Sequence, residues 1–176
     1  MNNLLEEKML NFTNGVRESI TDRNWYASLT LALTLPDICG RLEFPDKSSS
    51  KRYVHWFERY LMGKYTSNNP WGTHIFLNGE DAYALRCAYL HQGEANIEEQ
   101  RMRKVLADYL FVEPPSSGKI HCNQINNTLQ LQVDVFCTDV CDGVDEWVKH
   151  VSGNQTIQQR SEKLITIHRV ENGFSF

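Results

Sequence analysis

The stretch Asn78-Gly79-Glu80-Asp81-Ala82-Tyr83-Ala84-Leu85-Arg86-Cys87-Ala88-Tyr89-Leu90-His91-Gln92-Gly93 contains the signals for both ends of one helix. Asn78 is a favourable N-cap, and Glu80 and Asp81 put negative charge in the first turn, where the helix dipole favours it. Gly93 can adopt the left-handed conformation that closes the far end. Between these ends the side chains are apolar on every side, which predicts a buried helix.

Arg86 is a charged residue among apolar neighbours in this helix. The neighbouring positions 82, 83, 89 and 90 are all apolar, so no side chain of the same helix face neutralises the guanidinium. A buried charge without a partner is unfavourable, and we expect the partner to come from another segment, a second subunit or a ligand.

The run Arg86-Cys87-Ala88-Tyr89-Leu90-His91, with Gly93 close behind, resembles the R-x4-H motif of the HEPN superfamily. The resemblance covers about fifteen residues well and the helical first half of the chain loosely. It implies a small helical bundle, a homodimer in which two motifs meet, and the activity of many members, metal-independent RNA cleavage in toxin and antiviral systems. The family often has a polar residue directly after the arginine, where this chain has Cys87.

Composition indicates an ordinary globular domain. The chain has 176 residues, of which 41% are hydrophobic and 23% charged, which is enough for one domain over residues 1–176 and short for two. No apolar run approaches the roughly 20 residues of a membrane helix, and the acidic pair Glu6 and Glu7 is unlike a signal peptide. We therefore expect a cytoplasmic protein without a membrane span.

The net charge of −4 argues against a general nucleic-acid coat protein, because phosphate binding depends on concentrated positive charge. It leaves room for an enzyme that holds a short stretch of RNA locally. The five cysteines are scattered, which is unlike a disulfide framework. Cys137 and Cys141, with His121 and Cys122 upstream, lack the tight spacing of a zinc knuckle, so we favour reduced thiols and expect no metal and no cofactor.

The first half of the chain is predicted to be helical. Hydrophobic periodicity predicts helices over 3–20, 23–35 and from Ser49 or Ser50 to Leu61. Pro36 is expected to end the second helix, which places Asp37 at the stop. Residues 40–49 and 62–77 are expected to be loops.

In the second half of the chain, the hydrophobic pattern changes from helical periodicity to alternation. Residues 94–104 have helical composition, and 105–112 could extend that helix or form a strand. Alternation around a two-residue turn at Asn126 and Asn127 predicts a hairpin over 119–136, with Gln124 facing Leu129. A helix over 138–151 and a last strand over 163–170 follow. The prediction is an α+β fold, with a helical first half and then a small antiparallel sheet and one further helix.

Arg86 and His91 suit RNA cleavage. A base that removes the 2′-hydroxyl proton lets that oxygen attack the adjacent phosphorus, and His91 has a pKa of about 6.5 in its unperturbed form. The permanently charged guanidinium of Arg86 can stabilise the phosphorane. Residues five apart are separated by about 140° on a helix, so we expect either that the helix loosens near Gly93 or that each residue meets a second copy. The resemblance favours the second arrangement.

Each of these residues also has a structural interpretation. Arg86 can be a structural ion-pair partner of Asp37, Glu80 or Asp81, and Tyr89 a core residue. The cluster Lys51, Arg52 and Arg59 can hold phosphates or form a solvated helix face. The rival to the ribonuclease is therefore a non-catalytic dimerisation or interaction module that binds a protein such as an antitoxin or a defence component.

Overall fold

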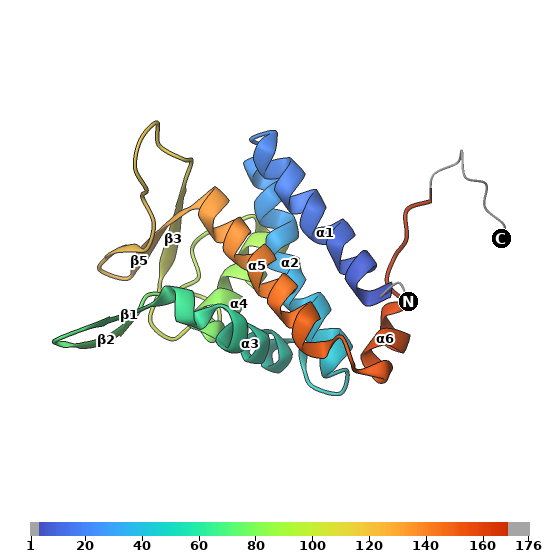
Figure 1. Cartoon of the computed structure of the whole chain (residues 1–176). Coiled ribbons are helices and arrows are strands. Elements are labelled where there is room, and N and C mark those ends of the chain that lie inside the picture. The colour runs from blue at the N-terminus through green and yellow to red at the C-terminus, as the bar shows by residue number, and fades with distance from the viewer. Residues whose placement is uncertain (1–3, 169–176) are drawn as a thin grey trace.

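The computed structural model describes residues 4–168 and has an α+β fold, in which most of the helices come first (Figure 1). The helices are α1 (Leu4–Thr21), α2 (Trp25–Glu43), α3 (Ser49–Tyr60), α4 (Gly79–Gln92), α5 (Val133–Val151) and the short α6 (Gln155–Ser161), with a 3-10 helix η1 at Met62–Tyr65. The strands are β1 (Thr66–Asn69), β2 (Gly72–Ile75), β3 (Asp108–Val112), β4 (Asn123–Ile125) and β5 (Thr128–Gln132).

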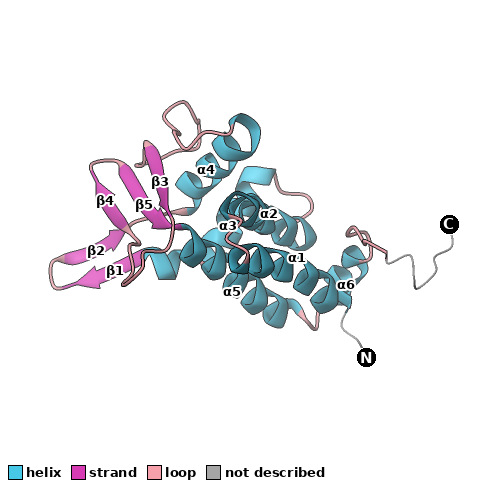
Figure 2. Ribbon diagram, turned by 90° about the horizontal axis from the view of Figure 1, so that it is seen from above, coloured by secondary structure: helices cyan, strands magenta, loops and turns pink. Residues whose placement is uncertain are grey.

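The helices form a bundle around one hydrophobic core, and the sheets lie at the end of the bundle away from α6 (Figure 2). α2 packs against α1, α3 and α5, and α3 also packs against α4. The largest fully buried side chains of the core include Trp56 and Trp147, and the Gly143 backbone lets Trp56 approach α5 closely. The predicted first and third helices correspond to α1 and α3, although residue 3 lies outside the described residues.

The prediction that Pro36 ends the second helix is wrong. α2 continues through Pro36 to Glu43, and Asp37 lies inside it. Leu35, Cys39 and Leu42 follow at helical spacing and are all buried, so burial of this face offsets the roughly 3 kcal/mol that an interior proline costs. The expected loop over 40–49 shortens to the segment between Glu43 and Ser49.

Residues 62–77 are also more regular than expected. They contain η1 and the antiparallel hairpin β1–β2, in which Asn69 pairs with Gly72 around a two-residue turn. The strands of this hairpin are polar and mostly exposed, so no alternation of buried side chains indicates them in the sequence.

The second sheet confirms part of the predicted hairpin over 119–136. Its strand order is β3-β5-β4, and β4 pairs antiparallel with β5 with Gln124 opposite Leu129, which is the predicted register. β3 pairs with β5 in parallel, so this sheet is mixed and not purely antiparallel. The sequence left open whether residues 105–112 continue a helix or form a strand. In the structure, residues 94–107 form turns and irregular backbone, and the strand β3 follows.

The prediction is wrong for the parts of the hairpin furthest from its turn. Cys122 has a φ of +57°, which interrupts the extended backbone before β4, and α5 begins at Val133, where a strand was expected to 136. Val133, Phe136, Cys137 and Val140 are buried at helical spacing, which explains the earlier helix start. The strand predicted over 163–170 is wrong for residues 163–168, which follow α6 without forming a strand, and residues 169 and 170 lie outside the described residues.

The ends of α4 are confirmed. The Asn78 side chain accepts a hydrogen bond from the Asp81 backbone N–H, and Gly93 adopts the left-handed conformation. The prediction of burial on every side is wrong, since Tyr83, Arg86 and Leu90 are only half-buried and His91 is exposed. α4 therefore presents one side to the core and keeps another at the surface.

Candidate functional site

Arg86 lies between Asp37 of α2 and His91 of its own helix. Arg86 Nη2 is 2.8 Å from Asp37 Oδ2, and Arg86 Nη1 is 3.2 Å from His91 Nε2. Only because α2 continues past Pro36 does Asp37 stand on a helix face opposite α4. Another segment of the same chain thus supplies the carboxylate that the sequence required for Arg86.

The expectation that Arg86 and His91 cannot meet within one helix is wrong. α4 stays helical through Gln92, and the two side chains are nevertheless in contact. The angle of about 140° describes Cα positions, and the long guanidinium side chain reaches around the helix. The spacing therefore no longer argues for a second copy of the chain.

Two further residues of α3 converge on Asp37. Ser49 Oγ donates a hydrogen bond to Asp37 Oδ1 at 2.7 Å, and Arg52 Nε lies 3.8 Å from the same oxygen. Ser49 was expected only at the start of the third helix, whose N-cap in the structure is Ser48. Arg52 is the one member of the predicted phosphate cluster that reaches this site.

The polar groups of this site are not fully satisfied. Within the described part of the chain, Asp37 Oδ2, Arg52 Nε and Arg86 Nε are buried atoms without a hydrogen-bond partner. The Arg86–Asp37 contact is therefore an ion pair whose atoms are close but not aligned as a hydrogen bond. Two guanidinium groups share one carboxylate, which leaves a net positive charge and unused donors at this position.

The site is reached by solvent. The side chains of Arg86 and Asp37 are 19% and 13% exposed, and His91 is exposed at the end of α4. Tyr53 and Tyr83 line the inner side with their rings edge to face at 5.5 Å. Burial raises the pKa of both phenols, so both hydroxyls stay protonated near neutrality.

The two acidic residues at the start of α4 lie away from Arg86. Asp81 is buried, and its carboxylate accepts hydrogen bonds from the backbone N–H groups of Lys104, Val105 and Leu106. It therefore anchors the irregular segment before β3. Glu80 lies with Lys51 at a separate shallow pocket on the outer side of α3.

Tyr89 and Arg59, which the sequence also suggested as site residues, contact other parts of the molecule. The Tyr89 hydroxyl is 3.5 Å from both Thr30 Oγ1 and the Tyr26 carbonyl oxygen of α2. Arg59 Nη2 is 3.0 Å from His150 Nε2 of α5. The predicted phosphate cluster of Lys51, Arg52 and Arg59 is therefore divided among three surfaces.

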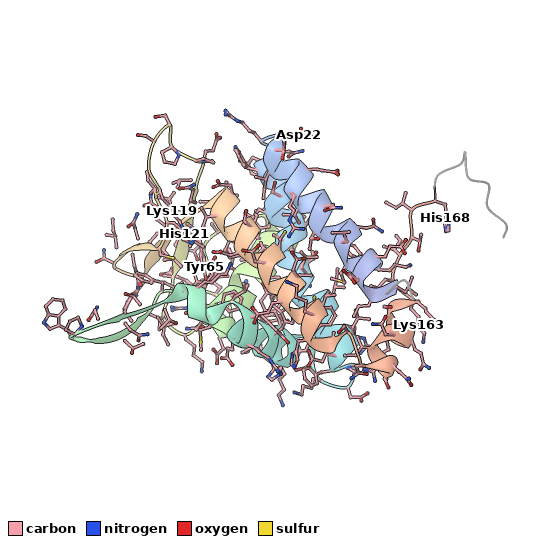
Figure 3. The ribbon with its side chains drawn as sticks, viewed as in Figure 1. Asp22, Tyr65, Lys119, His121, Lys163 and His168 are labelled. Carbon is pink, nitrogen blue, oxygen red and sulfur yellow. The ribbon has the colours of Figure 1, made fainter. Side chains whose placement is uncertain are left out.

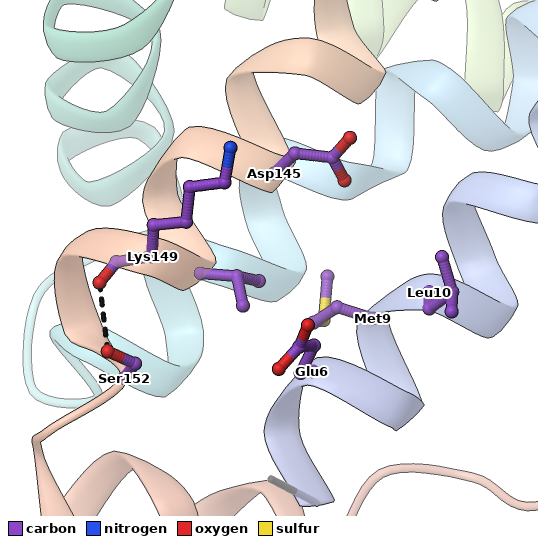
Figure 4. Close-up of a pocket in the computed structure, with 7 residues that line it drawn as sticks. Glu6, Met9, Leu10, Asp145, Lys149 and Ser152 are labelled. Carbon is purple, nitrogen blue, oxygen red and sulfur yellow. Dashed lines mark hydrogen bonds between the residues drawn. The ribbon is translucent and has the colours of Figure 1, made fainter.

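Two cavities in the described part of the chain lie away from the Arg86–His91 contact. A cavity of about 470 Å³ between α1 and α5 is lined by Glu6, Met9, Asp145 and Lys149 among others (Figure 4). A second cavity of about 310 Å³ lies where α4 ends. Neither Arg86 nor His91 lines either cavity, and the candidate site is a partly buried ion pair with His91 exposed at its edge.

A second cluster of polar side chains lies at the base of the sheets and was not foreseen. His121 packs beside Tyr65, with ring centres 5.6 Å apart (Figure 3). The Tyr65 hydroxyl donates to Asp139 Oδ2 at 3.1 Å, and Lys64 Nζ is 2.8 Å from Asp139 Oδ1. His121 Nδ1 accepts from the Gln132 N–H at 3.2 Å. This network ties η1 to α5 and to the start of the hairpin.

Cys137 and Cys141 are buried thiols. Burial raises the pKa of Cys137, and it raises the pKa of Cys141 to about 12, so neither is a thiolate near neutral pH. Among residues 4–168, no three His, Cys, Asp or Glu side chains come together as metal ligands.

None of the helices in the described part of the chain combines the length and apolar character needed to cross a membrane. Comparison of the chain with models of known protein families, with curated proteins and with solved structures found no match.

Proposed function

We propose that this protein is a HEPN-like, metal-independent endoribonuclease that acts in the cytoplasm. His91 takes the proton of a ribose 2′-hydroxyl, and the freed oxygen forms a bond to the adjacent phosphorus. The bond from phosphorus to the 5′-oxygen of the next nucleotide breaks, and that oxygen takes a proton from water. Arg86 stabilises the charge on the phosphorane. The products are a 2′,3′-cyclic phosphate and a 5′-hydroxyl end.

The contact between Arg86 and His91 carries this proposal. A guanidinium group has no acceptor, so Arg86 Nη1 donates and His91 Nε2 accepts with its lone pair. This Nε2 lone pair can take the 2′-hydroxyl proton once Arg86 Nη1 donates to the substrate phosphate instead. The exposure of His91 at the end of α4 leaves it accessible to a polymer substrate.

Asp37 and Arg52 support the roles assigned to Arg86. The ion pair at 2.8 Å holds the Arg86 side chain in one orientation, and Arg52 adds a second positive charge close by. A phosphate at this position would meet two guanidinium groups and one carboxylate, so its negative charge is attracted overall. The overall charge of −4 then restricts RNA to this local position.

The test is cleavage of RNA in the presence of EDTA. We expect the wild-type protein to produce cyclic phosphate ends, and Arg86→Ala and His91→Ala to lose at least about 100-fold in rate, the scale of one lost charge-stabilising or proton-transfer group. Arg101→Ala and His74→Ala are matched controls, because both side chains are exposed and lie outside the site. Equal cleavage by all five proteins would remove the roles of Arg86 and His91.

A homodimer through α4 belongs to the proposal. Tyr83, Cys87 and Leu90 recur at helical spacing and are all half-buried, which leaves a partly apolar stripe beside Arg86. A second copy that covers this stripe would bring two Arg86–His91 pairs together at the dimer interface. Sedimentation equilibrium of wild type and Leu90→Glu tests this, since a charge in the stripe should give monomers.

The alternative is a non-catalytic interaction module that binds a protein partner, such as an antitoxin or a defence component. The observation that favours it is the ion pair itself, since Asp37 already neutralises Arg86 as a structural partner would. Absence of cleavage for every RNA tested, with a folded wild-type protein, would favour this alternative.

A further inference from the structure

An aromatic pocket opens at the end of α4, close to the candidate site. Five aromatic side chains line it, namely Trp25 and Tyr26 of α2, Tyr89 of α4, and Tyr109 and Phe111 of β3. Its volume of about 310 Å³ is within the range of small-ligand clefts. α4 lies between α2 and β3, so the pocket is formed where these three elements meet (Figure 2).

The aromatic pocket and the ion pair lie along the same seam between α2 and α4. Arg86 reaches Asp37, and one turn later Tyr89 reaches Thr30 and Tyr26. Asp37 and Thr30 are seven residues apart on α2, which corresponds to about 10 Å along the helix. The seam therefore has an aromatic end and a cationic end that are separated by a short distance.

One aromatic side chain at the rim of the pocket is strongly exposed and takes no part in core packing. Tyr26 is 81% exposed although it is a large aromatic residue at the pocket rim. The pocket is lined by no lysine or arginine, and its one ionisable carboxylate is Glu113, which is exposed and makes no ion pair in the described part of the chain. An anion is therefore not favoured here, whereas a flat, uncharged ring is.

We propose that the aromatic pocket binds an unpaired base of single-stranded RNA whose adjacent phosphate lies at Arg86. This inference rests on the proposed function and names its substrate class. Base faces stack on aromatic side chains in proteins that bind single strands, and a paired base inside a duplex cannot enter such a pocket. The phosphate is directed to the cationic end of the seam, because Arg86 and Arg52 are there and Glu113 repels it from the pocket.

Glu113 adds a preference among bases. A carboxylate accepts hydrogen bonds from exocyclic amino groups, which adenine, cytosine and guanine carry and uracil lacks. The pocket therefore selects an amino-bearing base over uracil.

The experiment measures binding apart from cleavage. Fluorescence anisotropy is recorded with end-labelled 2′-O-methyl oligoadenylate and oligouridylate, which lack the free 2′-hydroxyl and stay intact. The variants are Tyr26→Ala and Glu113→Gln, both at exposed positions where folding is little affected. Trp71→Ala is the matched control, since Trp71 is 92% exposed on the distant β1–β2 turn.

We expect Tyr26→Ala to weaken oligoadenylate binding by about fivefold or more, the scale of one lost base stack. We expect Glu113→Gln to reduce the preference for oligoadenylate over oligouridylate, and Trp71→Ala to change neither. Binding that depends on Tyr26 in a protein that cleaves no RNA would uphold the pocket and refute the ribonuclease proposal.

Three outcomes would overturn the pocket assignment whatever the cleavage assay gives. They are binding that is unaffected by both pocket variants, equal binding of a duplex of the same length, and displacement of the oligonucleotide by free adenosine monophosphate as effectively as by unlabelled oligonucleotide. RNA cleavage by a protein with any of these properties would leave the proposed function intact.

Discussion

Asp37→Asn is the substitution that most directly tests the ion pair on which the candidate site depends. The amide keeps an oxygen that can accept from Ser49 Oγ, as Asp37 Oδ1 does at 2.7 Å, and has nearly the same volume as the carboxylate. The negative charge is removed, and Arg86 and Arg52 then face each other without a counter-ion. The effect on folding thus isolates charge from packing.

The magnitude follows from the burial of the pair. Exposed ion pairs contribute about 0–1 kcal/mol, whereas removal of one partner from a buried pair costs about 3–5 kcal/mol. Asp37 and Arg86 are 13% and 19% exposed, so the pair is closer to the buried limit. Allowing for the remaining solvent screening, we expect a loss of about 2–3 kcal/mol in the free energy of unfolding, or a fall in Tm of about 4–12 °C for a chain of this length.

The assay is urea unfolding followed by circular dichroism, supported by thermal melts. Asp46→Asn is the control, because Asp46 is exposed in the α2–α3 connection and its change should stay within about 0.5 kcal/mol. The double variant Asp37→Asn with Arg86→Gln removes both charges and should recover more than half of the loss. A single variant as stable as wild type, or a double variant whose loss is the sum of the two single losses, would refute the ion-pair reasoning.

Three other predictions concern the elements around the site. Asp81→Asn should destabilise the protein by about 2–4 kcal/mol, because a buried carboxylate loses backbone hydrogen bonds, and hydrogen exchange should show faster amide exchange in the segment before β3. Gly79→Ala should cost about 1–3 kcal/mol in a urea titration, since its Cβ would lie 2.9 Å from a backbone oxygen of α3, whereas Gly63→Ala meets nothing within 4 Å and serves as the control. Burial lowers the pKa of His121 from its ordinary value of 6.5. The His121 imidazole therefore binds a proton more readily in the unfolded chain than in the folded one. The His121 contribution to stability is therefore complete above about pH 6.5 and is lost as the pH falls below it, and a Tm series from pH 7.5 to 5.5 should be flatter for His121→Gln.

The parts of the fold that were predicted well are those with local signals. Both ends of α4 follow from Asn78 and Gly93, whose conformations depend on the residues beside them. The β4–β5 register follows from the Asn126–Asn127 turn, and Asn126 has the positive φ that such a turn requires. At these two places no distant contact overrides the local signal.

The parts that were missed depend on distant contacts. Pro36 is a local stop signal, and only the burial of Cys39 and Leu42 against other helices overrides it. The β1–β2 hairpin has no buried face, and β3 is a strand because β5 lies parallel beside it. These features cannot be read from periodicity, because the partner segments are far away in the sequence.

The candidate site illustrates how one such long-range contact changes a functional argument. The sequence shows that Arg86 lacks a neighbour of opposite charge, and a helix that ended at Pro36 would leave the position of Asp37 undetermined. Because α2 continues, Asp37 meets Arg86 at 2.8 Å, and the same guanidinium still reaches His91 at 3.2 Å.

A purely structural ion pair would require only the first of these contacts. The second contact places an exposed imidazole beside the cation, and the double variant that restores stability should not restore cleavage. Recovery of folding without recovery of RNA cleavage would separate the catalytic role of Arg86 from its structural one, and recovery of both would show that the charge has no role in the chemistry.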